Sequence, residues 1–312
     1  MKPVLLVLIH LSEEHRAQIA AAYDLAYAPT AAARAGQVAA RGAEVRAVLT
    51  NGSTGVTVAE LDAMPRLELV CALGAGYENL PLDAARARGI ALANGAGTND
   101  DCVADHAMGL LLAAVRGIPR LDAQVRDGVW RESIPLPPNV SGRRIGILGL
   151  GTIGRKIARR AEGFDIAVGY HNRKPHPEAP GGYRYFDSPA ALAAWADFLV
   201  VATPGGAGTQ HLVDAAVIDA LGPRGVLVNI ARGSVVDTAA LADALRAGRI
   251  AGAGLDVYEG EPRPPALLFG LPGVVLTPHV AGWSPEAVQQ SVDRFLANAA
   301  GHFAGTGVVS AI

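Results

Sequence analysis

The sequence predicts an α/β protein with two domains, each a parallel β-sheet with helices on both faces. Three observations lead to this fold class. Short apolar strands alternate with helical segments, the alternation occurs in two series on either side of a long apolar helix, and 312 residues suffice for two hydrophobic cores. We therefore expect two doubly wound sheets rather than a single larger one.

The composition narrows the classes of partner and compartment. Half of the residues are hydrophobic and 18% are charged, as is typical of a globular protein. The net charge is −2 and no basic tract occurs, so we expect neither nucleic acid nor a membrane surface as a partner. The apolar run Val4–Ile9 is short for a signal peptide and favours a first strand. Two cysteines outside any CxxC motif favour a reducing, cytoplasmic location.

Two series of apolar segments define the expected domains. The first series comprises Val4–Ile9, Val45–Leu49, Leu67–Leu73 and Ile90–Ala93. The second comprises Ile145–Leu148, Ile166–Tyr170, Phe198–Ala202, Val226–Ile230, Gly252–Leu255 and Val274–Thr277. A last helix, Pro285–Phe303, is expected to return to the first domain. The predicted domains are residues 1–98 with 285–312, and residues 99–284.

The segment between the two series is a predicted helix, Asp100–Arg116. Its apolar residues cover most of its circumference, which favours burial at a domain or subunit interface. The Pro-rich segment Trp130–Ser141 is predicted to be extended. Trp130 is a candidate for contact with a partner subunit, although ordinary packing explains it equally well. Cys102 and His106 lie four residues apart on the helix, but no third ligand lies nearby, so we predict no metal site.

A glycine motif opens the second series. Gly149, Gly151 and Gly154 form a GxGxxG turn between a predicted strand and a predicted helix, which is the context of a dinucleotide-binding site. The three glycines serve a tight turn, close approach of backbone to a pyrophosphate, and close packing of helix on strand. Thr152 and Ile153 open the helix, whose N-terminus attracts phosphate charge. The turn is predicted to bind the cofactor.

Further unusual residues follow the later strands of this series. Because ligands of open parallel sheets bind beyond the carboxyl ends of the strands, these residues are expected near the glycine turn. They are Thr203 and Pro204, then Ile230, Ala231 and Arg232, then Asp256, and finally His279 and Gly282. Singly, each could be a turn or capping residue, but their occurrence at one sheet edge favours a site.

Three segments carry a resemblance to a known family. The runs Asn229–Asp237, Leu255–Pro262 and Thr277–His279, with the glycine motif, resemble the signatures of the D-isomer-specific 2-hydroxyacid dehydrogenases. The resemblance implies two Rossmann-like domains: an NAD(P)-binding domain and a smaller flavodoxin-like substrate domain, with a cleft between them. It also implies a homodimer. The family's catalytic arginine, glutamate and histidine correspond to Arg232, Glu261 and His279.

The chemistry of a 2-oxo acid explains these residue types. Arg232 presents a planar fork that can hold a carboxylate and a carbonyl oxygen together. His279 is the expected proton donor to the carbonyl oxygen. Glu261 is expected to orient the imidazole and to favour its protonated form. Glu259 is the alternative carboxylate, but the family pattern places the functional one directly before Pro262.

Two further elements are expected to contact substrate. The run Leu73, Gly74, Ala75 and Gly76 follows a strand of the first domain, and its backbone N–H groups can form an anion-binding concavity. The family uses this loop for the substrate carboxylate, but a plain glycine turn is the alternative. Trp283, four residues past His279, either walls the pocket or belongs to ordinary packing.

The end of the second strand of the cofactor domain predicts the choice of cofactor. NAD-specific domains place a carboxylate there for the ribose 2′-hydroxyl, whereas this sequence has Asn172, Arg173 and Lys174. Asp165 precedes the strand and lies at the wrong edge. Basic residues suit a 2′-phosphate, so NADP(H) is predicted over NAD(H), which remains possible.

The substrate side chain is open at this point. The Asn172–Arg173 pair and the segment Cys102–Ala107 resemble the glyoxylate/hydroxypyruvate reductase branch. Larger 2-oxo acids such as 2-ketogluconate present the same reacting atoms. A sensor protein that binds NAD(P)(H) without catalysis, like the corepressors of this fold, is the rival from another class, because fold alone does not establish activity.

Overall fold

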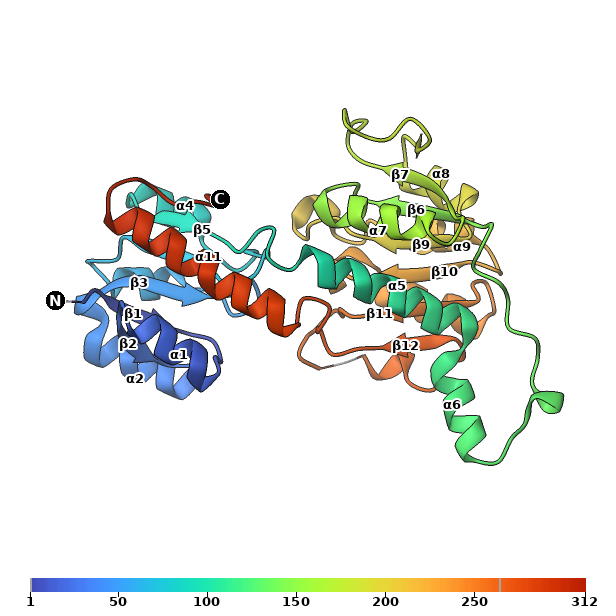
Figure 1. Cartoon of the computed structure of the whole chain (residues 1–312), viewed down its shortest axis with the longest axis horizontal. Helices are drawn as coiled ribbons and strands as arrows, with labels where there is room; N and C mark the ends of the chain where they lie inside the picture. Colours follow the sequence, from blue (N-terminus) through green and yellow to red (C-terminus); the bar gives the residue numbers. More distant parts are fainter. Residues whose placement is uncertain (1, 264) are drawn as a thin grey trace. The chain divides into compact units, whose positions relative to one another are not determined.

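The computed structural model describes residues 2–263 and 265–312 and separates into two compact units. The terminal unit consists of Met1–Asn99 and Gly282–Ile312, and the central unit consists of Asp100–Ala281. Each unit contains one sheet in which all strand pairs are parallel, apart from an isolated antiparallel bridge at the C-terminus (Figure 1). The predicted fold class, α/β with two parallel sheets, is confirmed.

The sheet of the terminal unit has five strands in the order β2-β1-β3-β4-β5. This is the flavodoxin-like order of a doubly wound sheet. The strands are β1 (Val4–Val7), β2 (Asp24–Tyr27), β3 (Val45–Thr50), β4 (Leu69–Ala72) and β5 (Ala91–Ala93). The sequence predicted four of them and missed β2, which is a four-residue edge strand with one buried residue and therefore lacks an apolar run.

Helices cover both faces of this sheet. One face carries α2 (Ala31–Arg41), α3 (Val58–Asp62) and α4 (Leu82–Ala87), and the other carries α1 (Glu13–Ala20) and α11 (Pro285–Phe303). Helix α11 has the predicted bounds, begins at the Ser284 cap, and packs Val292, Phe295 and Ala299 against the sheet (Figure 1). The C-terminal segment of the chain thus completes the core of the N-terminal sheet.

The sheet of the central unit has seven strands in the order β12-β11-β10-β9-β6-β7-β8. Counted from β6, this is the Rossmann order 3-2-1-4-5-6 with one further strand. The strands are β6 (Arg144–Leu148), β7 (Ala167–His171), β8 (Arg184–Tyr185), β9 (Phe198–Val201), β10 (Val226–Asn229), β11 (Gly252–Leu255) and β12 (Val274–Leu276). The two-residue edge strand β8 was not predicted, because it is too short to produce an apolar pattern.

Two helical layers enclose the central sheet. One face carries α5 (Asp100–Arg116) and α7 (Thr152–Glu162), and the other carries α8 (Pro189–Trp195), α9 (Ala215–Leu221) and α10 (Thr238–Arg246). The loops that follow β6, β7, β9, β10, β11 and β12 leave the sheet at its carboxyl edge, since all these strands run parallel. The predicted cofactor and catalytic residues of this unit lie on those loops.

Helix α5 is buried by its own unit. It packs on β10, β11 and α7, and Gly254 of β11 allows such close approach that a Cβ there would lie 2.9 Å from the Cβ of Leu110. On its outer side, Asp101 pairs with Lys156 at 2.6 Å and Asp105 with Arg160 at 2.6 Å. The interface that the sequence predicted for this helix is therefore accounted for by packing inside the central unit.

The exposed apolar residues of this region lie beyond α5. Helix α6 (Ile118–Arg126) departs from α5 at Gly117, and the chain then returns to β6 with one short turn at Arg131–Ser133 (Figure 1). Ile118, Val125, Trp130 and Leu136 are 53–95% exposed. We call these four residues the apolar arm. In the described part of the chain no single helix could cross a membrane. Taken together, α5 and α6 have the length and composition of a membrane-spanning segment, but the two helices are bent by 57° relative to each other.

Candidate active site

The glycine turn joins β6 to α7 and is shaped by two close backbone contacts. Gly149 has a φ of 104°, and a Cβ there would lie 2.8 Å from the carbonyl carbon of Ala202. A Cβ at Gly154 would lie 2.1 Å from the Gly149 oxygen. Gly151 differs, because a Cβ there would meet no atom within 4 Å. The first and third glycines are thus required by the fold, whereas the second leaves space in front of the turn.

This space fits the phosphate groups of a dinucleotide. Gly151 caps the N-terminus of α7 without a side-chain acceptor, and the first turn is exposed at Thr152 and partly exposed at Ile153. A helix N-terminus with unpaired N–H groups attracts an anion. Thr203 and Pro204 follow β9, the neighbour of β6, and lie at the same sheet edge.

The end of β7 is hydrogen-bonded to the glycine turn. Gly149 N donates to the His171 carbonyl at 3.0 Å, and Leu150 N donates to Asn172 Oδ1 at 2.7 Å. Asn172 therefore has a structural task at the position where NAD-specific domains carry a carboxylate. Arg173 and Lys174 are exposed beside it.

Arg232 lies on the loop after β10. The buried Asn229 shapes this loop: its Oδ1 accepts from Ala231 N at 3.0 Å and its Nδ2 donates to the Arg232 carbonyl at 3.0 Å. Ile230 and Ala231 are buried, and the Arg232 side chain is partly exposed. The loop thus presents its arginine on a fixed backbone.

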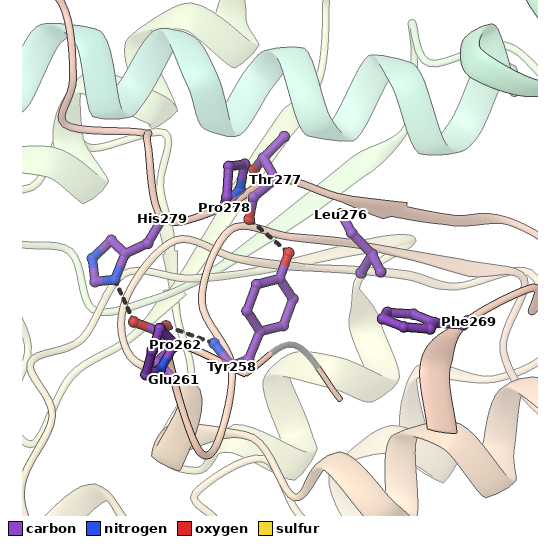
Figure 2. Close-up of a pocket in the computed structure, with 8 residues that line it drawn as sticks. All are labelled: Tyr258, Glu261, Pro262, Phe269, Leu276, Thr277, Pro278 and His279. Atoms are coloured by element: carbon purple, nitrogen blue, oxygen red, sulfur yellow. Dashed lines mark hydrogen bonds and ion pairs between the residues drawn. The ribbon is translucent and has the colours of Figure 1, made fainter. Parts of the chain in front are cut away.

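His279 and Glu261 form a hydrogen-bonded pair. The distance between His279 Nδ1 and Glu261 Oε2 is 2.7 Å, and the other carboxylate oxygen accepts from Tyr258 N at 2.8 Å (Figure 2). Burial acts to raise the pKa of Glu261, but these bonds and the nearby Arg232 charge outweigh it and hold that pKa below its ordinary value. Glu261 is therefore an anion at neutral pH, and the pairing leaves Nε2 as the imidazole nitrogen that can face a substrate.

The backbone of His279 is held in the left-handed region, with a φ of 55°. Such a conformation costs a non-glycine residue about 1–2 kcal/mol and requires support from its surroundings. The support comes from Asp256, which is fully buried. Its carbonyl accepts from His279 N at 2.8 Å, and its carboxylate accepts from Val280 N and Ala281 N, each at 2.9 Å.

Two further side chains reach the Asp256 carboxylate. Thr277 Oγ1 donates to it at 2.6 Å, and His106 Nε2 lies 2.9 Å from Thr277 Oγ1. Burial acts to raise the pKa of Asp256, but its hydrogen bonds hold the pKa below the ordinary value. The sequence indicated Asp256 as a cofactor contact, and the structure places its carboxylate inside the protein as the anchor of the His279 loop. From the sequence, His106 was a poor metal ligand and a member of the Cys102–Ala107 segment, but its contact with Thr277 was not predicted. Its polar side chain on an apolar helix was the available signal.

A cavity of about 390 Å³ lies beside the pair and is lined mainly by apolar side chains. Its lining consists of Tyr258, Glu261, Pro262, Phe269, Leu276, Thr277, Pro278 and His279 (Figure 2). The Tyr258 hydroxyl donates to the Thr277 carbonyl at 2.6 Å, and burial, with the charges of Asp256 and Glu261, raises its pKa to about 12. Tyr258 therefore stays neutral and supports the same loop as Asp256.

The remaining predicted residues belong to the terminal unit. The Leu73–Gly76 run follows β4, and it is held by bonds from Gly95 N to the Gly74 carbonyl at 2.9 Å and from Asn94 Nδ2 to the Ala75 carbonyl at 2.8 Å. Gly282 packs against Asn99, and Trp283 is 77% exposed. Their roles toward substrate and cofactor stay predictions. Among the described residues no group of three or more His, Cys, Asp or Glu side chains could hold a metal ion.

The comparisons with known proteins agree with this geometry. The family model of the D-isomer specific 2-hydroxyacid dehydrogenase NAD binding domain matches residues 108–281. The hydroxyphenylpyruvate reductase of Plectranthus scutellarioides is 42% identical over 262 residues, which cover 84% of this chain and 83% of that protein. The chain belongs to the D-isomer-specific 2-hydroxyacid dehydrogenase family. As a member of that family it is an NAD(P)-dependent oxidoreductase.

Two further relatives refine the comparison. Glyoxylate/hydroxypyruvate reductase A HPR2 of Arabidopsis thaliana is 39% identical over 269 residues, covering 86% of this dehydrogenase and 85% of the relative. The crystal structure of an NADPH-dependent glyoxylate/hydroxypyruvate reductase from Sinorhizobium meliloti, in complex with NADP and malonate, matches with a TM-score of 0.92 at 36% identity, covering all of this chain and 97% of that one. The family resemblance inferred from the motifs is confirmed.

Replacement of Gly151 and of Gly154, the second and third glycines of the turn, provides a test of the cofactor site. In Gly151→Ala the new Cβ occupies the open space before the turn, and we expect NADPH binding to weaken at least tenfold, roughly 1.4 kcal/mol, with unfolding unchanged. In Gly154→Ala the Cβ meets the Gly149 carbonyl, and we expect a loss of stability of about 1–3 kcal/mol. Fluorescence titration and thermal unfolding measure the two effects. Unaltered NADPH binding by Gly151→Ala would contradict the assignment.

Proposed function

We propose that this dehydrogenase reduces small 2-oxo acids, such as glyoxylate or hydroxypyruvate, to D-2-hydroxy acids and prefers NADPH. The observation that carries the proposal is the His279–Glu261 pair, with its 2.7 Å hydrogen bond, near the Arg232 charge. A proton donor, a carboxylate that orients it and a fork-shaped cation are the groups that reduction of a 2-oxo acid needs. The names of the relatives support the same substrate class.

The proposed mechanism assigns one task to each side chain. Arg232 binds the substrate carboxylate and carbonyl oxygen, which orients and polarises the ketone. When bound, the reduced nicotinamide supplies the hydride that adds to the carbonyl carbon. His279 gives its Nε2 proton to the carbonyl oxygen, so a secondary alcohol forms and a neutral imidazole remains. Glu261 accepts from Nδ1 throughout, which fixes the orientation of the ring and leaves Nε2 directed to the substrate.

The size of the substrate is the second part of the proposal. Relatives named for glyoxylate, hydroxypyruvate, hydroxyphenylpyruvate and 2-ketogluconate all match at about 40% identity. We favour the small acids because of the Asn172–Arg173 pair and the segment Cys102–Ala107. The sensor alternative is not favoured, because the relatives quoted above are named reductases and the catalytic set is complete in this chain.

The first test measures initial rates of NADPH oxidation with glyoxylate and with hydroxypyruvate. We expect turnover by the wild type and a rate lower by about 10²–10⁴-fold in His279→Ala, the usual contribution of a positioned general acid. His302→Ala, which changes a histidine of α11 outside the candidate site, serves as a control and is expected to keep the wild-type rate. Equal rates of wild type and His279→Ala would refute the mechanism.

The preference for NADPH rests on the end of β7. The site offers the exposed cations Arg173 and Lys174 and no carboxylate between residues 170 and 174, which suits a 2′-phosphate better than a 2′-hydroxyl. The complex of the S. meliloti relative with NADP supports this choice.

Replacement of Arg173 tests that preference. In Arg173→Ala we expect the KM for NADPH to rise about tenfold or more and the KM for NADH to change less than twofold, because only NADPH carries the 2′-phosphate. Arg159→Ala, an equal change of charge on the exposed side of α7, should leave both values unaltered. Equal losses for the two cofactors in Arg173→Ala would remove the argument for NADPH.

We also propose that the protein is a homodimer in the cytoplasm. The apolar arm exposes four large hydrophobic side chains on one connected segment, and a second copy of the chain is the partner that would cover them. The two cysteines are free thiols, which fits a reducing compartment.

Sedimentation equilibrium tests the dimer. We expect the wild type at twice the 32.1 kDa chain mass, and the double variant Val125→Glu/Leu136→Glu as a monomer, because each charge would be buried in the interface. The matched control is Val309→Glu, which changes an equally exposed valine of the terminal unit and should stay dimeric. A monomeric wild type would show that the apolar arm has another role.

A further inference from the structure

Two glutamates of the loop after β11 point to different partners. Glu261 pairs with His279, whereas Glu259 pairs with His211, at 2.7 Å between Glu259 Oε1 and His211 Nε2. The acid–base chemistry uses only the first of these pairs. The second pair lies on the loop that carries Glu261, and its partners adjoin the loop that carries Arg232.

The Glu259 carboxylate joins three segments of the central unit. Its Oε2 accepts from Thr238 N at 3.1 Å, at the start of α10, which begins six residues after Arg232. Carboxylates at helix N-termini are stabilised by the unpaired N–H groups there. Its Oε1 holds His211 of the segment before α9. One side chain therefore ties the Glu261 loop to the end of the Arg232 loop and to a neighbouring segment.

The backbones of these segments are in direct contact. A Cβ at Gly233 would lie 1.9 Å from the carbonyl carbon of Tyr258, so the Arg232 loop rests on the residues just before Glu261. On the other side, His211 N donates to the Ser234 carbonyl at 2.8 Å, and Val213 N donates to Val235 O at 3.0 Å. The loop of Arg232 is thus enclosed between the Tyr258–Glu259 backbone and the His211–Val213 segment.

His211 reaches Glu259 from an unfavourable backbone conformation. Its φ is 48°, in the left-handed region, which costs a non-glycine residue about 1–2 kcal/mol. Its Nδ1 lies 3.9 Å from Asp237, the residue that caps α10. A strained residue persists where surrounding contacts outweigh the strain, and here those contacts are to Glu259, Ser234 and Asp237.

We propose that Glu259 and His211 are positioning residues that hold the Arg232 loop in place relative to the Glu261–His279 pair. The arginine that binds the substrate carboxylate and the histidine that donates the proton lie on separate loops, and this pair sets the distance between those loops. The inference rests on the proposed reduction of 2-oxo acids. It predicts that loss of the pair affects substrate binding through Arg232 more than the proton transfer itself.

Electrostatics limits the pH range of the pair. The hydrogen bond to Glu259, together with Asp237, raises the pKa of His211. Burial acts to raise the pKa of Glu259, but its bonds to Thr238 and His211 hold that pKa below the ordinary value. The charged pair therefore exists between the lowered pKa of Glu259 and the raised pKa of His211. Its contribution is lost as the pH rises through the latter.

The experiment compares Glu259→Ala, Glu259→Gln and the double variant His211→Ala/Glu259→Ala with the wild type. The matched control is Asp243→Asn, which removes the charge of an exposed carboxylate on α10 that pairs with Arg246. For each protein, kcat and KM are measured at saturating NADPH with whichever of glyoxylate and hydroxypyruvate the wild type reduces faster. Calorimetric binding of oxalate to the NADPH-loaded enzyme is the second readout.

We expect Glu259→Ala to raise the KM and the oxalate Kd about tenfold, the effect of about 1.4 kcal/mol, while kcat falls less than threefold. Glu259→Gln should recover most of the loss, because an amide oxygen still accepts from Thr238 N. The double variant should resemble Glu259→Ala, since residues in one pair are not additive.

The outcomes separate the two proposals. In one outcome Glu259→Ala is less stable to heat, but its KM and oxalate Kd stay within twofold of the wild type. This outcome would overturn the positioning role and leave the proposed function intact. A wild type that neither turns over these acids nor binds oxalate would refute the proposed function and, with it, this inference. An equal effect of Asp243→Asn would show that charge at α10, rather than the Glu259 contact, is responsible.

Discussion

The buried carboxylate of Asp256 is the constraint on which the candidate active site depends. His279 adopts a left-handed backbone that its side chain disfavours, and the N–H groups of residues 279–281 all point to Asp256. The His279 N–H donates to the Asp256 carbonyl, whereas the Val280 and Ala281 N–H groups donate to its carboxylate, which would cost several kcal/mol if it were buried unpaired. The loop held in this way carries the imidazole that meets Glu261 at 2.7 Å.

The parallel topology then brings the functional groups together without long connections. Strands β10, β11 and β12 are parallel neighbours in the sheet. Arg232, Glu261 and His279 each follow the carboxyl end of one of these strands, so all three lie at the same sheet edge. The glycine turn follows β6, two strands further along the same edge. A single sheet edge thus carries the glycine turn proposed to bind phosphate, the arginine proposed to bind the substrate carboxylate and the proposed proton donor, as is usual for Rossmann topology.

The sequence predicted most of this architecture because its signals are local. The central strands are continuous apolar runs, and helices α5 and α11 have the bounds that their patterns predicted. Edge strands β2 and β8 were missed, since a short half-exposed strand produces no apolar run. The catalytic set could be inferred from motifs, but contacts between distant residues could not. His106 meets Thr277 across 171 residues, and His211 meets Glu259 across 48, and neither pair leaves a periodic pattern.

Asn172, at the end of β7, shows how one position can meet a requirement of the fold without fixing the choice of cofactor. Leu150 N donates to position 172, so any residue with a side-chain oxygen there, Asn or Asp, can fix the glycine turn to β7. Aspartate would add a negative charge that repels a 2′-phosphate, whereas Asn172 makes the same bond as a neutral group. The neighbouring cations Arg173 and Lys174 are exposed. In the proposed preference for NADPH, charge at residues 172–174 can therefore change while the fold requires only one hydrogen-bond acceptor at residue 172.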